Sequence, residues 1–439
     1  MDFKESRTPK IAFILNFFPM VSETFIISEI QNLLKRNIQL DLFSLFKSDK
    51  YEKRTDLGEL EKRVCFLLPL LKFGILVKSH ISFFCRHPLR YCKTLIFALK
   101  NRNERFVLKT IFKFLANAGK SREVMSKKDR QNIFVHFILV MPFAGLIDNG
   151  GYDQVHAHYA DTTTSFAMLI SKLCSIPFSF TTHATDLFVE PYSMDIKIAE
   201  AKFIITCTEY NKKYIVDNFK DINKEKIIVN YHGVDTNYFK PEKTAVRDDR
   251  KIPVILTVGR LVPKKGFDVL LQACRILHDK KILFKCKIIG HGPEKENLLK
   301  QVNDLSLTDV VGFLGLVPPV AMKNYYAASD VFALPCRITE RGDRDGIPNV
   351  LAEAMAMEMA VVSTRVSGIP EIVIQDETGL LVEPENPEQL AAALIDLLSA
   401  PEKSKQLGLY ARNHLKKIFD KQIKCDELVD IFINQVNLN

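Results

Sequence analysis

Short apolar runs alternate along this chain with stretches whose apolar residues recur every three or four positions. An apolar run of four to eight residues predicts a buried strand, and the wider spacing predicts an amphipathic helix. KIAFILNF (10–17) is a predicted strand, followed by a predicted helix, FIISEIQNLLKRN (25–37), and a second strand, IQLDLFSL (38–45). Because strands and helices alternate, we expect parallel sheets joined by crossover helices.

The alternation occurs twice, on either side of a polar stretch, KPEKTAVRDDRK (240–251). Further strands are predicted at 154–159, 178–184, 203–208 and 226–234, then at 253–261, 285–292, 310–315, 331–336, 360–365 and 379–384. Helices at 387–400, 403–417 and 423–436 close the chain. We therefore expect a first domain at 1–245, a second at 246–420, and a last helix at 421–439 that packs back on the first domain. Two doubly wound units in tandem would leave a ligand crevice at the strand carboxyl ends, between the units.

Composition places the chain among soluble globular proteins, with 47% hydrophobic and 26% charged residues. The nine cysteines show no CxxC spacing, and the charged start of the sequence does not resemble a secretory leader. A reducing, cytoplasmic setting is expected.

The positive charge is concentrated in one block. Residues 61–130 hold 17 Lys and Arg against 4 Asp and Glu. Its apolar runs fall short of the ~20 residues of a membrane span, but 91–115 reads as a basic amphipathic helix suited to an anionic membrane surface. Core helices with solvated basic faces are the alternative. Nucleic-acid binding is disfavoured, because the block lacks zinc spacing, a helix-turn-helix pattern and a base-stacking aromatic motif.

Candidate chemistry begins after the strand at 253–258. Arg260 and Lys265 follow it closely, and two cations at a strand end suit a pyrophosphate. Lys264 is expected to be solvent-exposed. In IIGHGPEKE, Gly290 and Gly292 fit a dinucleotide fingerprint, but Lys295 stands where the third glycine belongs. Either a sugar-nucleotide crevice or a plain strand turn is the better interpretation.

The stretch DRDGIPNVLAEAM (343–355) predicts an anion site at the start of a helix. Pro348 has the backbone angle favoured in a first helical turn. The N–H groups of Asn349, Val350 and Leu351 would point backwards, with the helix dipole behind them.

Two acids frame that helix start. Glu353, further along the helix, can accept hydrogen bonds from a vicinal diol such as a ribose, and Asp345 can do the same for sugar hydroxyls. Gly346 lets the backbone approach a ligand closely. Alternatively, Glu353 is an exposed carboxylate on a helix face with no role in binding.

Metal binding finds less support. Asp343-Arg344-Asp345 spells DxD, but so short a pattern arises often by chance. His156 and His158 share a strand face at period two, yet with His183 they lack a fixed third ligand in the sequence, so a hydrogen-bonded strand histidine is expected for His156. His158 ends its strand and either lines the crevice or packs.

Several motifs together resemble family 4 retaining glycosyltransferases, which have the GT-B fold of two Rossmann-like domains. VGRLVPKKGFDVLLQA, IIGHGP, YYAASDVFALPC, DGIPNVLAEAMA and GIPEIV…TGLLV are similar to the C-terminal domain of that family. The helix start is similar to its E-x7-E motif, with Asp345 in place of the first Glu. SETFIISEI, VHAHYAD, TTHATDLF and ITCTEYN resemble the subgroup that builds colanic-acid-type and other exopolysaccharides.

The resemblance implies a role for each matching residue. Arg260 and Lys265 would hold the donor diphosphate, Glu353 the ribose, and Asp345 with the backbone of Gly346 and Ile347 the donor sugar. Gly290, Pro348, Asn349 and Val350 would complete the donor site. His183 would lie beside the transferred sugar, near Asp186. Ser22, Glu23, Thr24, His158 and Asp186 would face the acceptor, although Val21-Ser22-Glu23-Thr24 replaces the Gly-rich turn usual in relatives.

The activity implied is retaining transfer from a nucleotide-diphosphate sugar to a polyprenyl-diphosphate-linked glycan at the inner face of the membrane. His183, Asp345, Arg260 and Lys265 would form the catalytic set, with no metal ion and no cofactor. Fixed cations and dipoles would neutralise the leaving group. A sugar-nucleotide epimerase of the same fold and a non-catalytic membrane-surface nucleotide-sugar binder are the alternatives.

Overall fold

The computed structural model describes residues 8–19, 24–47, 60, 62–102, 132–189, 191–220, 222–241 and 252–437. The chain divides into two compact units, described here one at a time. The first comprises Met1–Cys207, Lys212–Asn230 and Cys425–Asn439, and the second comprises Thr208–Asn211 and Tyr231–Lys424. The second unit therefore takes up the chain at Tyr231, upstream of the expected boundary at 245. Val234 explains this, because its backbone pairs with Phe419 and Lys421.

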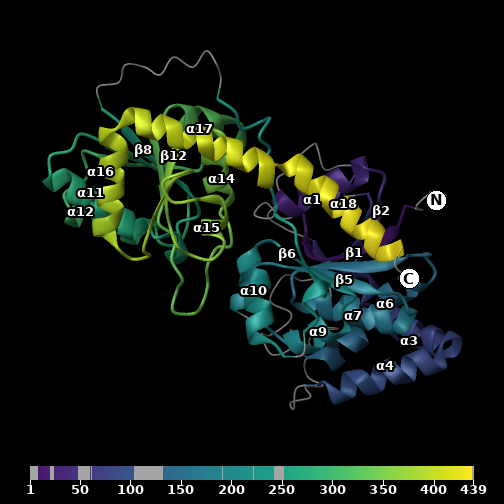
Figure 1. The fold of residues 1–439 in the computed structure, drawn as a ribbon. Helices are drawn as coiled ribbons and strands as arrows, with labels where there is room; N and C mark the ends of the chain where they lie inside the picture. Colours follow the sequence, from purple (N-terminus) through teal and green to yellow (C-terminus); the bar gives the residue numbers. More distant parts are fainter. Residues whose placement is uncertain are drawn as a thin grey trace, which may run out of the picture. The chain divides into compact units, whose positions relative to one another are not determined.

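The first unit is built on a seven-stranded parallel sheet of order β3-β2-β1-β4-β5-β6-β7 (Figure 1). The strands are β1 (Lys10–Phe18), β2 (Gln39–Lys47), β3 (Val64–Phe66), β4 (Gln154–His158), β5 (Phe178–Thr182), β6 (Phe203–Thr206) and β7 (Ile227–Val229). The helices are α1 (Thr24–Lys35), α3 (Phe73–Arg86), α4 (Pro88–Lys100), α6 (Ile133–Asp148), α7 (Thr162–Cys174), α8 (Ala184–Phe188), α9 (Met194–Glu200), α10 (Glu209–Asn218), which begins in the second unit, and α18 (Lys421–Asn437), which ends in the first.

Helices cover both faces of this sheet. α1 and α18 lie on one face, and α6 and α7 lie on the other, with α3 and α4 packed outside them (Figure 1). Leu428 and Phe432 of α18 belong to the same buried cluster as Phe13 of β1 and Ile30 of α1. The last helix thus supplies part of the first unit's core.

The second unit has a six-stranded parallel sheet of order β10-β9-β8-β11-β12-β13 (Figure 1). The strands are β8 (Val254–Val258), β9 (Lys285–Ile289), β10 (Val311–Gly315), β11 (Val331–Leu334), β12 (Ala360–Thr364) and β13 (Leu380–Val382). The helices are α11 (Phe267–Asp279), α12 (Lys295–Asp304), α13 (Met322–Ala327), α14 (Asn349–Ala356), α15 (Ile369–Ile372), α16 (Pro387–Ser399) and α17 (Pro401–Ile418).

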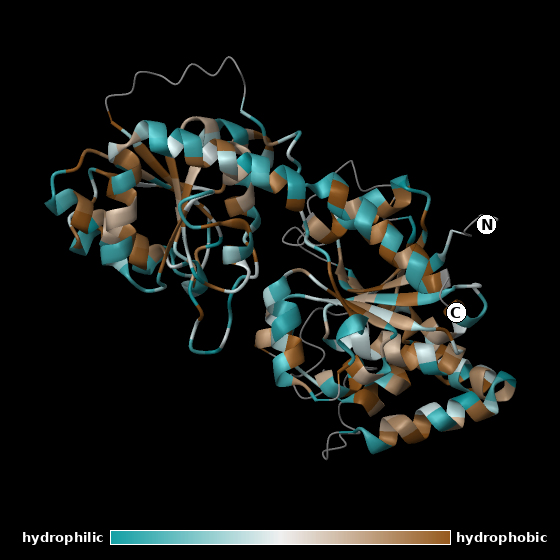
Figure 2. Cartoon of the chain, in the orientation of Figure 1, coloured by the Kyte–Doolittle hydropathy of each residue, from teal (hydrophilic) through white to brown (hydrophobic). Residues whose placement is uncertain are grey.

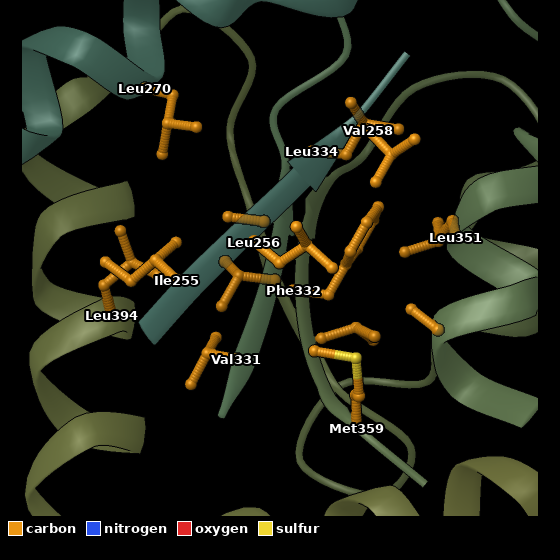
Figure 3. Close-up of a cluster of buried hydrophobic side chains, with 14 of the residues drawn as sticks. Ile255, Leu256, Val258, Leu270, Val331, Phe332, Leu334, Leu351, Met359 and Leu394 are labelled. Carbon is orange, nitrogen blue, oxygen red and sulfur yellow. The ribbon is translucent and has the colours of Figure 1, made fainter. Parts of the chain in front are cut away.

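The core of the second unit lies on both faces of its sheet. Figure 3 shows Leu270 and Leu394 on one side of β8 and β11, and Leu351 of α14 on the other. The central strand β8 is buried along its whole length, which is why its sequence is a continuous apolar run rather than an alternating one. Two doubly wound parallel sheets confirm the predicted fold class.

Candidate functional site

In the second unit the strand order reverses between β8 and β11. Loops that leave neighbouring strands in opposite directions open a crevice at the carboxyl ends, where such sheets bind ligands. Arg260 and Lys265 follow β8, and Asp345 lies between β11 and α14. Three of the residues expected to hold the donor therefore lie on loops at this switch point.

Glycines bring these loops together. Gly266 has φ +67, and a Cβ there would lie 1.9 Å from the carbonyl oxygen of Pro335. A Cβ at Gly290 would lie 1.9 Å from the carbonyl oxygen of Gly259. Neither contact is possible for a residue with a side chain, so glycine allows the loops after β8, β9 and β11 to touch through their backbones.

Two lysines converge on one carboxylate. Lys265 Nζ lies 2.6 Å from Asp345 Oδ2, and Lys264 Nζ lies 3.4 Å from Asp345 Oδ1 and 3.0 Å from Asp343 Oδ1. The prediction that Lys264 is solvent-exposed was wrong. Lys264 and Lys265 belong to one short 3-10 turn (Pro263–Lys265), so both side chains reach the acidic loop. Arg260, by contrast, is exposed.

The ion pairs set the charge of this cluster. Burial acts to raise the pKa of Asp345, but Lys265 and Lys264 outweigh it and hold that pKa below its usual value. Burial likewise opposes the charge on Lys265, yet Asp345 raises its pKa above the ordinary range. The neighbouring Cys336, whose Sγ lies 3.8 Å from Asp345, has its pKa raised to about 12 by burial and by that carboxylate. The cluster is thus two ammonium groups around an ionised carboxylate, with a neutral thiol beside them.

Helix α14 starts one residue later than predicted. Pro348 is its N-cap residue, and the Pro348 carbonyl accepts a hydrogen bond from the Leu351 N–H at 3.0 Å. The predicted free N–H at Leu351 was therefore wrong, because the cap carbonyl takes the first intrahelical bonds. The N–H groups of Asn349 and Val350 precede those bonds, beside Gly346 and Ile347.

Glu353 is held by a tyrosine that the sequence did not indicate. Its Oε2 accepts a hydrogen bond of 2.7 Å from the hydroxyl of Tyr326, a fully buried residue of α13. Burial raises the pKa of Glu353, and the Tyr326 bond offsets part of that increase. Glu353 is thus partly buried and oriented, not an exposed carboxylate on a helix face.

In the first unit the strand order reverses between β1 and β4. His158 ends β4, and His183 follows β5 next to it. His158 Nδ1 lies 3.5 Å from His183 Nε2, and His158 Nε2 lies 3.1 Å from Glu29 Oε1 on α1. His156, His158 and Glu29 have ligand atoms within 4.8 Å of one another, but both His156 nitrogens also lie within hydrogen-bond distance of the Ser179 and Thr181 hydroxyls.

Asp186 is a structural acceptor in this unit. Its carboxylate accepts hydrogen bonds from the His183 N–H, the Ala160 N–H and the Thr182 hydroxyl. Burial raises its pKa to about 7. These bonds fix the backbone beside His183 and the turn after β4.

Lys197 stabilises the same turn through hydrogen bonds to backbone carbonyls. This fully buried lysine donates to the carbonyl oxygens of Ala160, Asp161 and Tyr192 at 2.8 to 2.9 Å. Burial lowers its pKa to about 7. The bonds stabilise a turn in which Tyr159 has φ +70 and its ring lies 4.5 Å from that of His183.

The structure thus groups the predicted residues by unit. His158, His183 and Asp186 meet in the first. Lys265 and Asp345 meet in the second, where Arg260 is exposed and Glu353 is bound to Tyr326. Ser22 and Glu23 lie outside the described residues, and Thr24 opens α1 with a side chain that is not described. Sequence reasoning missed Glu29, Lys197 and Tyr326. In the sequence, only the placement of Glu29 on a predicted helix beside the first strand end pointed to the site.

Two units, each with a doubly wound parallel sheet, have the architecture of the GT-B fold. Two family models match adjoining parts of the chain: Glycosyltransferase Family 4 over residues 116–238, and Glycosyl transferases group 1 over residues 239–414. Together the two models span residues 116–414, and both are models of glycosyltransferases, so the chain is similar to family 4 glycosyltransferases in both of its units.

Two of the similar proteins are named for amylovoran or colanic acid biosynthesis. The amylovoran biosynthesis glycosyltransferase AmsK of Erwinia amylovora is 26% identical, over 96% of this chain and 98% of its own. The putative colanic acid biosynthesis glycosyltransferase WcaL of Escherichia coli is 36% identical, over 47% of this chain and 51% of its own.

Solved structures share the fold across the whole chain. A glycosyltransferase from Rickettsia africae has a TM-score of 0.69 at 18% identity, covering 98% of this chain and 99% of its own. Anabaena HepE, solved in complex with UDP and glucose, has a TM-score of 0.65 at 16% identity, covering 97% and 99%. Within the described ranges, no helix combines the length and the apolarity needed to cross a bilayer.

Proposed function

We propose that this glycosyltransferase moves a sugar from a nucleotide-diphosphate sugar to a lipid-linked glycan, with retention and without a metal ion or cofactor. The product would be an intermediate of a bacterial exopolysaccharide, O-antigen or capsule. The observation that carries the proposal is the cluster of Lys264, Lys265 and Asp345 at the switch point. HepE, of the same fold, is solved with UDP-glucose.

The cluster suits a diphosphate next to a sugar. An ammonium group has three donors, so Lys265 keeps one on Asp345 and offers the others to phosphate oxygens. Arg260 is exposed at the end of β8, where a guanidinium can bind the diphosphate as a fork. Asp345 keeps lone pairs for sugar hydroxyls, and Glu353 accepts from the ribose.

This placement supports the following reaction. The bond between the anomeric carbon and the diphosphate oxygen breaks, and the diphosphate leaves with the electron pair. The acceptor hydroxyl attacks the same face and gives its proton to the departing phosphate oxygen. Arg260, Lys265 and the first N–H groups of α14 stabilise the charge that develops on the leaving group, which is the task a metal ion performs in other transferases.

A nucleotide-sugar panel tests the donor site. We expect one donor to raise the melting temperature of the wild type in EDTA. At a hundredfold excess over Kd, the donor should stabilise the folded state by about 2.7 kcal/mol. Arg260→Ala should lose the shift, and Arg365→Ala should keep it, because Arg365 forms a half-exposed ion pair with Glu383. If no donor shifts the wild type with EDTA or with manganese, the donor site is refuted. Release of nucleoside diphosphate then separates a transferase from an epimerase.

The lipid-linked acceptor would bring the protein to an anionic membrane surface at the inner face of the plasma membrane. Between Lys62 and Arg102 the sequence holds nine Lys and Arg and no Asp or Glu. On α3 and α4, large apolar side chains are exposed among these cations, and Figure 2 shows brown and teal residues alternating along both helices. The exposed apolar residues are Phe73, Ile75, Val77, Ile81, Phe84, Leu89, Ile96 and Leu99.

This docking face combines the two attractions that hold a peripheral protein. Each basic residue near an anionic leaflet contributes about 1 kcal/mol, and each apolar side chain that enters the acyl boundary adds about 0.8 kcal/mol per buried CH₂. The inner side of α3 packs against the rest of the protein, since Leu76 and Phe83 are buried. The rest of the basic block, 103–131, lies outside the described residues.

Vesicle sedimentation tests the docking face. We expect the wild type to bind vesicles containing phosphatidylglycerol and not pure phosphatidylcholine. The double variant Ile81→Asp/Leu89→Asp should lose most of that binding. Leu316→Asp, at a leucine 80% exposed in the second unit, should bind as the wild type does. Equal binding by the double variant would rule out α3 and α4 as the docking face.

A further inference from the structure

Three polar side chains from three elements form a line in the first unit. Glu29 lies on α1, His158 ends β4, and His183 follows β5. The link from Glu29 Oε1 to His158 Nε2 is 3.1 Å, and the link from His158 Nδ1 to His183 Nε2 is 3.5 Å. Each ring nitrogen of His158 therefore faces a specific partner.

The two imidazole rings meet edge to edge. Their planes differ by 20°, and their centroids are 5.8 Å apart. This separation exceeds the nitrogen-to-nitrogen distance of 3.5 Å by about the two centroid-to-nitrogen distances of an imidazole. The nitrogens therefore point at each other along one line, as a hydrogen bond requires.

Donor and acceptor chemistry gives the line a direction. A carboxylate only accepts, so the proton of the first link belongs to His158 Nε2. A neutral His158 then has a lone pair at Nδ1, and His183 Nε2 must donate to it. Glu29 thereby selects the tautomer of His158. His158 then acts on His183 together with the Asp186 N–H, from which the His183 side chain accepts a hydrogen bond, and both favour a proton on His183 Nε2.

The surroundings prevent water from replacing these bonds. The His158 side chain is fully buried and that of Glu29 is 13% exposed. The ring of Phe13 lies 5.7 Å from that of His158. The rings of Phe25 and Tyr159 lie 5.1 and 4.5 Å from that of His183. Aromatic packing restricts the plane of the His183 ring, and the hydrogen bond with His158 determines which ring nitrogen faces His158.

We propose that Glu29 and His158 are positioning residues that fix the tautomer and the ring orientation of His183. The consequence for turnover rests on the proposed function, in which His183 lies beside the transferred sugar. The placement of the protons does not rest on it. A ring held in one tautomer presents the same face and polarity to every substrate, which lowers the reorganisation needed at the reacting centre.

Nitrogen NMR on protein labelled with ¹⁵N-histidine reads the tautomers directly. The chain has ten histidines, and His158→Gln and His183→Gln assign the two signals. We expect both residues to carry their proton on Nε2. Glu29→Leu should shift His158 toward the other tautomer and alter the His183 signals, and Glu29→Gln, which keeps an acceptor oxygen, should do so to a smaller extent. Glu200→Gln is the control, since Glu200 forms an ion pair with Lys172 on the surface of the same unit.

Two results would overturn the inference. One is an NMR result in which His158 of the wild type carries its proton on Nδ1, or in which no Glu29 variant changes the His158 and His183 nitrogen signals. The other is a stoichiometric change of the His156 and His158 ring nitrogen signals on addition of zinc, because Glu29 and these histidines would then form a metal site.

Turnover supplies the second arm, with nucleoside diphosphate release from the donor that the wild type hydrolyses. Glu29→Leu should lower kcat about ten- to hundredfold, the value of one charge-assisted hydrogen bond, and leave the donor KM within about twofold. Glu29→Gln, which keeps an acceptor oxygen, should recover part of the rate. An unchanged kcat in both variants would refute the positioning role. A wild type that hydrolyses no donor would refute the proposed function, while the NMR arm still decides the tautomers.

Discussion

Replacing Tyr326 by phenylalanine removes one oxygen atom from the second unit and isolates one carboxylate. The Tyr326 hydroxyl donates to Glu353 at 2.7 Å, and its ring is fully buried in the core. The phenylalanine ring fills the same space, so the cavity is no larger than the lost hydroxyl. The cost comes mainly from Glu353, which loses a donor and remains partly buried.

The magnitude depends on pH, and the sign follows from the pKa of Glu353. Burial already raises that pKa, so ionising Glu353 costs stability as pH rises above the usual value of 4.5. The tyrosine bond offsets part of the cost, and Tyr326→Phe raises the pKa further. The added loss should be about 1–3 kcal/mol at about pH 8 and smaller at about pH 5, where more of the carboxyl is protonated.

Differential scanning calorimetry measures the effect in the full chain. A loss of 1 kcal/mol lowers the melting temperature of a domain of this size by about 2–4 °C. Tyr325→Phe, one residue earlier in α13, is the control and should melt with the wild type. Equal losses for Tyr326→Phe at both pH values would show that packing, not the charge on Glu353, accounts for the effect.

Two further substitutions test the backbone around each site. Gly266→Ala should destabilise the second unit by about 1–3 kcal/mol, because φ is +67 and the new Cβ would collide with the Pro335 carbonyl. Gly312→Ala is the calorimetric control, because its Cβ would enter open space. Lys197→Met should lower the stability of the first unit by about 3–5 kcal/mol, because three buried carbonyls lose their donor. Lys213→Met, at an exposed position of α10, is the control and should change the stability by less than about 0.5 kcal/mol.

Sequence reasoning succeeded where burial and periodicity agree. β8 and α11 follow from a continuous apolar run and a clear three-to-four spacing. Helix α6 was not predicted, because it is apolar on every side and has no periodicity. Helix α7 opens on three threonines, which favour strands, and depends on the Asp161 side chain accepting from the Thr163 N–H.

Some residues of the candidate site could be named from the sequence, but their contacts could not. Arg260, Lys265 and Asp345 follow from strand-end position and family resemblance. The pairing of Lys264 with Asp345 depends on the 3-10 turn and on the left-handed Gly266, which place consecutive lysines on one side. Glu29 and Tyr326 act across the fold, on partners 129 and 27 residues away in sequence, and a single sequence contains no signal for such pairs.

The position of α18 has a consequence for synthesis on the ribosome. Leu428 and Phe432 complete the buried cluster that begins at Ile11, so the first unit lacks part of its core until nearly the whole chain has been made. The second unit contains no residue beyond Lys424, so its core does not need the part of α18 that completes the first unit, and that part is synthesised after it. The N-terminal unit would then finish folding last, reversing the usual N-to-C order of domain folding.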